Sequence, residues 1–385
     1  MNYFLTEEQT MIKDLAAQIA DEKIKPVAIK YDEEGTFPYD ILKILADSDL
    51  CGVYIEEEYG GLGGGIFEMS LVVEELSRAC GGISLSYAGT GLGTFPIILF
   101  GNIEQKKKYL PDIASGKNIA AFGLTEANAG SDASGIQTTA VLDGDEYVLN
   151  GTKQWITNGG EAQIYTVIAC TNRSKGARGF SAFIVEKGTP GFSFGKKENK
   201  MGIRASCTSE LVFDDCRIPK ENLLSNEGTG FIVAMKTLDR TRPGVAAQAL
   251  GIATGAFDEA LKYSKQREQF GSPISSFQAV QHILADMAIQ IEASRAMLYA
   301  TCRYIDSGAK NISKESAMCK VLASDTAMKV TTDAVQILGG YGYMKEYPVE
   351  KMMRDAKVTQ IYEGTNQIQR NIIALQLLKE LKSKK

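Results

Sequence analysis

The chain has little of what metal binding and disulfide bonding require. Its 385 residues include one histidine, His282, and no Cys-X-X-Cys pair. A catalytic zinc needs three converging protein ligands, so we expect no metal site. The cysteines are odd in number and far apart, which indicates free thiols in a reducing compartment rather than a disulfide framework; they are Cys51, Cys80, Cys170, Cys207, Cys216, Cys302 and Cys319.

Concentrated positive charge and long apolar runs are also missing. The net charge is −5, and the longest basic run is Lys106 to Lys108. Neutralising phosphates takes a dense basic face, so we expect no nucleic-acid partner. No uninterrupted apolar run reaches about 18 residues and no basic leader segment occurs, so we expect no membrane span. The location expected is the bacterial cytoplasm or, alternatively, the mitochondrial matrix as a mature protein.

The hydrophobic pattern changes twice along the chain. Helical spacing dominates the two outer parts, where Thr6 and Gln9 predict a capping box. β-Branched and aromatic runs fill the middle, joined by the turn pairs Asp143-Gly144 and Asn150-Gly151. The glycine-rich residues 59–65 lack the Gly-X-Gly-X-X-Gly frame of a dinucleotide site, so we interpret them as a turn.

The order helices, sheet, helices indicates an α+β fold and not a Rossmann fold. The pattern predicts a helical domain at residues 1–118, a middle antiparallel β domain at 119–230 and a second helical domain at 231–385. In the last domain, helices are expected at residues 231–238, 245–266, 276–306, 313–338 and 365–382.

One carboxylate, Glu363, stands among apolar residues in the stretch Val358 to Ile373, between Tyr362 and Gly364. Desolvation disfavours the charged form of a carboxylate, so the pKa of Glu363 should rise toward the range useful to a proton-abstracting base. The alternative interpretation is that Glu363 ends a helix while Gly364 supplies a turn.

Two further stretches suit a flat, anionic ligand. Small residues and hydroxyls in Phe122 to Asp132 let backbone amides approach a bound group. On a strand, Trp155 and Thr157 share a face, so the indole can lie against a ring whose edge the hydroxyl binds. The alternatives are an ordinary polar loop and a core tryptophan.

Two charged clusters follow. Arg267 beside Phe270 suits a pyrophosphate and an adenine face, although both could belong to an ordinary helix end. Asp239 and Arg242 share a helix face, and the alternative there is a surface ion pair of little energetic value.

Three motifs together resemble the acyl-CoA dehydrogenase family: FGLTEANAGSD (122–132), QILGGYGY (336–343) and IYEGTNQIQR (361–370). The similarity covers effectively the whole chain and is closest to short- and medium-chain members such as butyryl-CoA dehydrogenases. It implies an N-terminal helical, middle β and C-terminal four-helix-bundle-like fold in a homotetrameric FAD enzyme. The reaction implied converts an acyl-CoA to a 2-enoyl-CoA, with electrons passed to electron-transferring flavoprotein.

The resemblance also assigns roles to residues. In one subset of the family the catalytic glutamate stands at the position that matches Thr241. This chain has threonine there, so Glu363 would be the α-proton base. The substrate contacts implied are Ser131, Asp239, Arg242, Tyr362 and Gly364. The FAD contacts implied, some of them to the FAD of a neighbouring subunit, are Phe122, Leu124, Thr125, Ser131, Trp155, Ile156, Thr157, Arg267, Gln269, Phe270, Gln278, Gln336, Ile337, Gly339, Gly340, Thr365 and Gln367.

Other functions share these motifs: an enoyl-CoA reductase supplied by a bifurcating flavoprotein, an oxygen-using acyl-CoA oxidase, and a non-catalytic binding protein. The acyl group is also open. Gly89, Gly91 and Gly93 lie in the segment that walls the acyl pocket in the family. Their small size suggests a wider group, medium-length, cyclic or aryl, unless the wall is simply bent.

Overall fold

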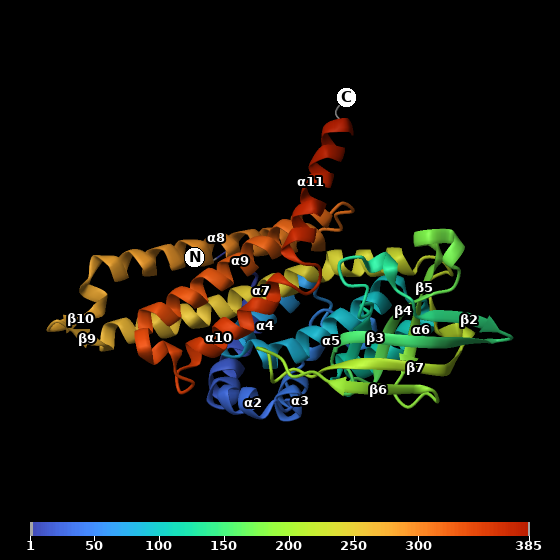
Figure 1. Ribbon diagram of the computed structural model, residues 1–385, viewed down its shortest axis with the longest axis horizontal. Coiled ribbons are helices and arrows are strands. Elements are labelled where there is room, and N and C mark those ends of the chain that lie inside the picture. The colour runs from blue at the N-terminus through green and yellow to red at the C-terminus, as the bar shows by residue number, and fades with distance from the viewer. Residues whose placement is uncertain (1–2, 384–385) are drawn as a thin grey trace.

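The computed structural model describes residues 3–383. Residues 1–2, at the start of the first expected domain, and residues 384–385, at the end of the last one, lie outside the described residues. Figure 1 shows long helices along one part of the molecule and a β-sheet at one end. The expected α+β order of helices, sheet and helices is confirmed.

The N-terminal part is helical. Thr6 and Gln9 cap its first helix through two reciprocal bonds of 3.1 Å, which confirms the expected capping box. Residues 59–65 form a turn, in which the Leu62 and Gly63 amides donate at 2.9 Å to the carbonyls of Gly52 and Ile55. The helices are α1 (Glu7–Ile19), α2 (Ala28–Glu34), α3 (Tyr39–Asp47), α4 (Ile66–Ala79), α5 (Gly81–Phe100) and α6 (Ile103–Ala114).

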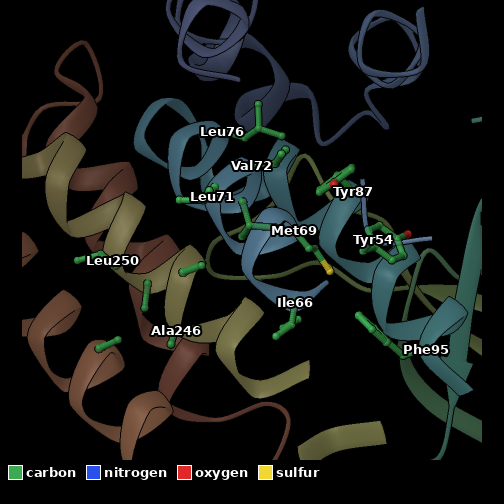
Figure 2. Packing of buried hydrophobic residues seen from close by; sticks show 14 of the residues in the cluster. Tyr54, Ile66, Met69, Leu71, Val72, Leu76, Tyr87, Phe95, Ala246 and Leu250 are labelled. Carbon is green, nitrogen blue, oxygen red and sulfur yellow. The ribbon is translucent and has the colours of Figure 1, made fainter. Parts of the chain in front are cut away.

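Helix α5 is the apolar centre of this layer. Among residues 3–383 it is the one helix long and apolar enough to cross a membrane, and 72% of its 18-residue window is buried inside the protein. Glycines bring it close to its neighbours: a Cβ on Gly93 would stand 2.4 Å from the Ala121 nitrogen, and one on Gly91 would stand 2.2 Å from the Met69 Cε. Figure 2 shows this core, with Met69 of α4 extending toward Tyr54.

Eight strands form the main sheet in the order β6-β7-β3-β2-β4-β5-β8, with β1 beside β4. Most neighbours are antiparallel, but β1 and β2 pair with β4 in parallel, which the expected antiparallel sheet did not include. The predicted turn at Asp143-Gly144 is confirmed between β2 and β3. The strands are β1 (Ala120–Gly123), β2 (Thr139–Asp143), β3 (Glu146–Thr157), β4 (Ile164–Cys170), β5 (Phe180–Glu186), β6 (Phe192–Lys197), β7 (Thr208–Pro219) and β8 (Leu223–Leu224).

The predicted turn at Asn150-Gly151 is wrong. Both residues lie inside β3, where its pairing with β7 shifts register. A Cβ on Gly151 would stand 2.6 Å from the Thr138 Oγ1, so glycine is needed there for close approach of another segment. Packing therefore overrides the turn preference of Asn-Gly.

The C-terminal part begins with one helix, α7 (Gly230–Gln266), where the sequence predicted two. Pro243 has no N–H and so leaves the Asp239 carbonyl without its helical donor. The Ser316 hydroxyl supplies that donor at 2.6 Å, which lets the helix continue. The other helices are α8 (Gln278–Asp306), α9 (Ser313–Leu338), α10 (Pro348–Lys357) and α11 (Asn366–Ser383), and the hairpin of β9 (Glu268–Gln269) and β10 (Ser272–Pro273) joins α7 to α8.

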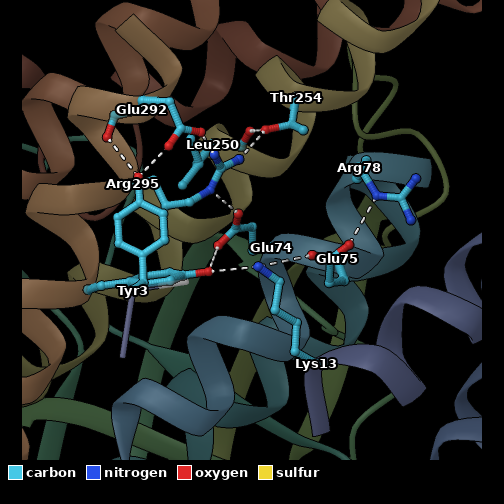
Figure 3. A network of polar contacts seen from close by, with 10 residues as sticks. Tyr3, Lys13, Glu74, Glu75, Arg78, Leu250, Thr254, Glu292 and Arg295 are labelled. Atoms are coloured by element: carbon cyan, nitrogen blue, oxygen red, sulfur yellow. Dashed lines mark hydrogen bonds and ion pairs between the residues drawn. The ribbon is translucent and has the colours of Figure 1, made fainter. Parts of the chain in front are cut away.

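A polar network fastens the N-terminal helices to this second helical part (Figure 3). Glu74 of α4 is buried and accepts from the Arg295 guanidinium and the Tyr299 hydroxyl of α8, both at 2.8 Å. Lys13 of α1 donates to the same tyrosine at 3.1 Å and lies 3.6 Å from Glu75. Separating the helices would leave a buried charge without its partner of opposite sign, so the network holds α1, α4 and α8 in one arrangement.

Candidate functional site

The principal cavity lies where α5, α7, the end of β3 and the segment before α11 meet. Its wall is mostly apolar, with a few hydroxyls, one guanidinium and one carboxylate among the side chains. An apolar cavity with a few polar groups is the usual form of a small-molecule binding site. The predicted site residues on its wall are Phe122, Leu124, Thr125, Ser131, Trp155, Ile156, Thr157, Arg242, Tyr362, Glu363 and Gly364.

Glu363 lies in the short link between α10 and α11 and ends no helix. Its φ is +51° and that of Gly364 is +91°. A glutamate in the left-handed region is uncommon and is held there by its surroundings. The Gln369 side chain donates to the carbonyls of Glu363 and Gly364 at 3.0 and 3.1 Å, and the Arg242 Nε lies 3.4 Å from the Glu363 carbonyl.

The Glu363 carboxylate has one direct partner, the Thr241 hydroxyl of α7, which donates to its Oε2 at 2.8 Å. No cation lies within 4.0 Å of it among the described residues. Burial raises the pKa of Glu363 to about 7, although the Thr241 hydrogen bond and the charges of Arg242 and Lys320 act in the opposite direction. A carboxylate with that pKa can take up a proton near neutral pH.

The segment 122–131 presents hydroxyls to the cavity and is fixed from behind. The side chains of Thr125 and Ser131, both on the cavity wall, make no hydrogen bond to a described residue. Behind them, buried Glu126 accepts from the Lys153 ammonium at 2.8 Å and from the Thr138 hydroxyl at 2.6 Å. The loop can therefore offer donors to a ligand without losing its own support.

Trp155 is not a core residue. Its side chain is 54% exposed on the cavity wall, and no described ring packs against it. Its φ of +58° falls where β3 shifts register against β7 between Lys153 and Ile156. This bulge explains why Trp155, Ile156 and Thr157 all reach the cavity, which strict alternation along a strand forbids.

The Asp239 and Arg242 pair is buried, so the surface ion pair considered from the sequence is wrong. The Arg242 Nη1 lies 2.6 Å from the Asp239 Oδ1. Arg242 faces the cavity, whereas Asp239 does not line it. Asp239 thus orients the guanidinium from behind, and its proposed direct contact with substrate stays a prediction.

The remaining predicted residues lie elsewhere. A second hollow, lined by Arg267, Gln269, Ile337, Gly339 and Gly340, lies beside the β9–β10 hairpin, at the end of the long helices opposite the sheet (Figure 1). Phe270 is 96% exposed at the tip of that hairpin. The Arg267 guanidinium lies 5.4 Å from the Tyr341 ring centroid and not against Phe270.

Besides Asp239 and Phe270, four predicted residues line neither hollow. Gln278, Gln336 and Gln367 are exposed, and the Thr365 hydroxyl accepts from the Ile368 amide at 3.3 Å at the start of α11. Thr365 and Gln367 are next in the chain to Gly364 and Ile368, which line the principal cavity, whereas Gln336 is next to Ile337 of the second hollow. The role of all four residues in FAD binding stays a prediction.

The sequence missed several residues around the cavity. Met69 of α4 lies on its wall, and Gln248 of α7 accepts from the Tyr362 hydroxyl while its own amide donates to the Gly81 carbonyl at 2.9 Å. Lys320 of α9 donates to the Gly364 carbonyl. These residues come from helices distant in the chain, and no local pattern marks them.

The side chains on the cavity wall suit a flavin. Residues 3–383 hold no group of three His, Cys, Asp or Glu side chains that could bind a metal ion, and the seven cysteines are unbonded. A half-exposed indole and the hydroxyls of Thr125 and Ser131 on the cavity wall are features that a flat, hydrogen-bonding ring requires. The fold and the cavity thus fit a flavin-dependent oxidoreductase, and Glu363 stays its predicted base.

Comparisons with known proteins identify the family. Residues 6–117, 121–216 and 228–378 match the acyl-CoA dehydrogenase N-terminal, middle and C-terminal domains. The chain is 48% identical over 376 residues to a short-chain specific acyl-CoA dehydrogenase of Clostridium acetobutylicum, covering 97% of this chain and 99% of the relative. The chain belongs to the acyl-CoA dehydrogenase family and is an FAD-dependent oxidoreductase.

Two solved structures and one further relative are similar over nearly their full length. The butyryl-CoA dehydrogenase of Megasphaera elsdenii has a TM-score of 0.96 and 48% identity, covering 98% of this chain and all of that one. A chain from a study of the electron transferring flavoprotein of Acidaminococcus fermentans and flavin-based electron bifurcation has a TM-score of 0.96 and 53% identity, with the same coverage. An acryloyl-CoA reductase (NADH) of Anaerotignum propionicum is 49% identical, covering 98% of this chain and 96% of the relative.

Proposed function

We propose that the protein oxidises a short acyl-CoA at its α,β bond. Glu363 takes the α-proton, the β-carbon loses a hydride, and the product is the 2-enoyl-CoA. When bound, FAD supplies the hydride acceptor. The observation that carries this proposal is a single carboxylate, free of any direct cation, whose pKa is raised to about 7 on the wall of the cavity.

The link around Glu363 also suits the thioester. The Glu363 amide makes no hydrogen bond to a described residue. A free backbone N–H beside the base can donate to the thioester oxygen, where negative charge develops as the α-proton leaves. Arg242, held by Asp239, presents a fixed positive charge to the anionic CoA moiety.

Met69 supports a short acyl group. Its Cε fills the space beside Gly91 of α5 and lies 3.9 Å from the Cβ position of Gly244 on α7. The backbone of β1 likewise occupies the space beside Gly93. Of the three glycines that suggested a wider pocket, only Gly89 lines the cavity. Because Met69 and the β1 backbone fill the space beside the other two glycines, we favour a straight chain of about four carbons over a cyclic or aryl group.

We further propose a homotetramer in the bacterial cytoplasm, with domains at 1–118, 119–230 and 231–385. The second hollow lies beside the β9–β10 hairpin, at the end of the long helices opposite the sheet, which supports a neighbour completing each site (Figure 1). Four leucines on α11 are exposed and offer an apolar face for such a contact: Leu375, Leu377, Leu378 and Leu381. The half-exposed Trp155 gives electrons a route to an electron-transferring flavoprotein.

A second candidate function is the reverse reaction, reduction of a short enoyl-CoA. The similarity to an acryloyl-CoA reductase (NADH) favours it. The same base would then give its proton to the α-carbon. The physiological electron partner, and not the cavity, separates the two directions.

Anaerobic titration of the FAD-loaded protein tests the proposed function. Butyryl-CoA should bleach the flavin at a much higher rate than octanoyl-CoA or the aryl substrate 3-phenylpropionyl-CoA. Glu363→Gln keeps the shape of the side chain but removes the base, so it should bind butyryl-CoA while bleaching slows by about 10³-fold or more. Bleaching of Glu363→Gln at the wild-type rate would remove Glu363 from the mechanism, and equal rates with all chain lengths would reject the short pocket.

A further inference from the structure

Three lysines are almost completely buried: Lys153, Lys320 and Lys351. Two of them form ion pairs, Lys153 with Glu126 at 2.8 Å and Lys351 with Asp355. Lys320 of α9 is 0% exposed and has no carboxylate within 4.0 Å among the described residues. Burying an ammonium without a direct counter-ion is unfavourable, so this lysine needs an explanation that the other two do not.

The contacts of Lys320 all lead to the link that carries the base. Its ammonium donates to the Gly364 carbonyl at 3.0 Å and to the Asn366 Oδ1 at 2.8 Å. Asn366 is itself held by Ser324 and Asp325 of α9, at 2.9 and 2.8 Å. The carbonyl that follows Glu363 is therefore anchored to α9 through one cation and one amide.

This anchor acts on a strained part of the backbone. Glu363 and Gly364 both have positive φ, a combination that the chain does not adopt without outside support. Gln369 supports the same two carbonyls from α11, and Arg242 approaches from α7. Lys320 alone contributes a full charge to the Gly364 carbonyl.

We propose that Lys320 is a positioning residue for the base: its ammonium fixes the Gly364 carbonyl, so that the Glu363 carboxylate faces the cavity, and it serves as the distant counter-charge of that carboxylate. This inference rests on the proposed role of Glu363.

The charges around the two groups agree with the proposal. Glu363 faces the cations Arg242 of α7 and Lys320 of α9. Lys320 faces Glu363, Arg242, Asp325 of α9 and Arg370 of α11. Burial lowers the pKa of Lys320 to about 7, and Glu363 is the largest of the charges that act to raise it. Each group thus favours the charged form of the other.

Two substitutions separate the hydrogen bond from the charge. Lys320→Gln can still donate to the Gly364 carbonyl but carries no charge, and Lys320→Met has neither. In both variants the pH at which flavin reduction by butyryl-CoA is half-maximal should rise, by less than about one unit, because removing a distant cation raises the pKa of Glu363. Lys320→Met should also lose about 10-fold or more in the limiting rate, since the link is no longer fixed, whereas Lys320→Gln should keep most of it.

A direct titration of Glu363 provides a readout that does not depend on turnover. The infrared carboxylic-acid C=O band that is absent from Glu363→Gln should persist to higher pH in Lys320→Gln than in the wild type. Lys351→Met is the control, because it also removes a buried lysine but lies away from the base, and its midpoint should equal that of the wild type.

An unchanged Glu363 titration in Lys320→Gln would overturn the proposal. If Lys320→Met does not bind FAD, Lys320→Gln alone decides the question. Wild-type protein whose flavin is not bleached by any acyl-CoA would instead refute the proposed function, so the two failures are distinguishable.

Discussion

Two glutamates near the cavity, the buried Glu126 and the half-buried Glu363, have opposite acid strengths. Glu126 accepts hydrogen bonds from Lys153 and from the hydroxyl and amide of Thr138, at 2.6 to 2.9 Å. Burial acts to raise its pKa, but the Lys153 charge and these bonds outweigh burial and hold the pKa of Glu126 below its usual range. Glu363 has one hydroxyl partner, and there burial prevails.

The difference shows that burial alone does not make a base. Both side chains are removed from bulk water, yet the one with a cation at 2.8 Å stays charged and supports a loop. The other has its cations at a distance and can bind a proton near neutral pH. In the first case the lysine contacts the carboxylate directly, and the pair has a structural role. In the second case the lysine contacts a backbone carbonyl instead, and the carboxylate can exchange a proton.

Breaking the ion pair of Glu126 with Lys153 should have the largest effect, a loss of folding stability. Glu126→Gln leaves the Lys153 ammonium buried without a counter-ion, and removing one partner of a buried ion pair destabilises by about 3–5 kcal/mol. The segment 122–131 should loosen, so we expect a lower urea midpoint and loss of bound flavin absorbance on gel filtration. The double variant Glu126→Gln with Lys153→Met should recover part of the stability. A double variant no more stable than Glu126→Gln would show that the charge pairing is unimportant.

The pH dependence of stability should run in opposite directions for the two carboxylates. Glu126 has a lowered folded-state pKa, so its contribution is present above the unfolded-state pKa and is lost as pH falls. The folded-state pKa of Glu363 is raised, so between about pH 4.3 and about pH 7 the folded state binds a proton that the unfolded state does not. Stability therefore falls as pH rises through this range.

Glu363→Gln should therefore be more stable than the wild type by an amount that grows with pH. We expect little difference at pH 4 and on the order of 1–3 kcal/mol at pH 8, because one pKa unit corresponds to about 1.4 kcal/mol. Urea unfolding of the flavin-free proteins at pH 4, 6 and 8 measures this difference in the free energy of unfolding. A difference that stays constant across this range would mean that Glu363 titrates normally.

Local sequence signals predicted the candidate base and two stretches of the cavity wall but not how they are held. A lone glutamate in an apolar run and a tryptophan in a β-type run are visible in a single segment. The bulge that turns Trp155 toward the cavity depends on the pairing of β3 with β7, and the continuation of α7 through Pro243 depends on Ser316 of α9. Neither partner is near in the chain.

The same limit applies to the residues around Glu363. Lys320 precedes the base by more than forty residues, and an isolated lysine in a helical run predicts a solvated side chain. Met69, likewise, is an ordinary core residue until α5 presents Gly91 to it. Motifs thus predict which groups react, whereas tertiary packing sets their acidity and the size of the pocket.

The smallest effect should come from the one direct partner of the base. Thr241→Val has nearly the same shape but no hydroxyl, so it removes the hydrogen bond that favours the charged carboxylate. The pKa of Glu363 should then rise, and the pH of half-maximal flavin reduction should rise by less than about one unit. Thr241→Ser keeps the donor and should match the wild type. A midpoint that moves down in Thr241→Val would mean that the hydroxyl accepts from the protonated acid and does not donate to the carboxylate, and would reverse the direction in which the nearest neighbour of Glu363 tunes the base.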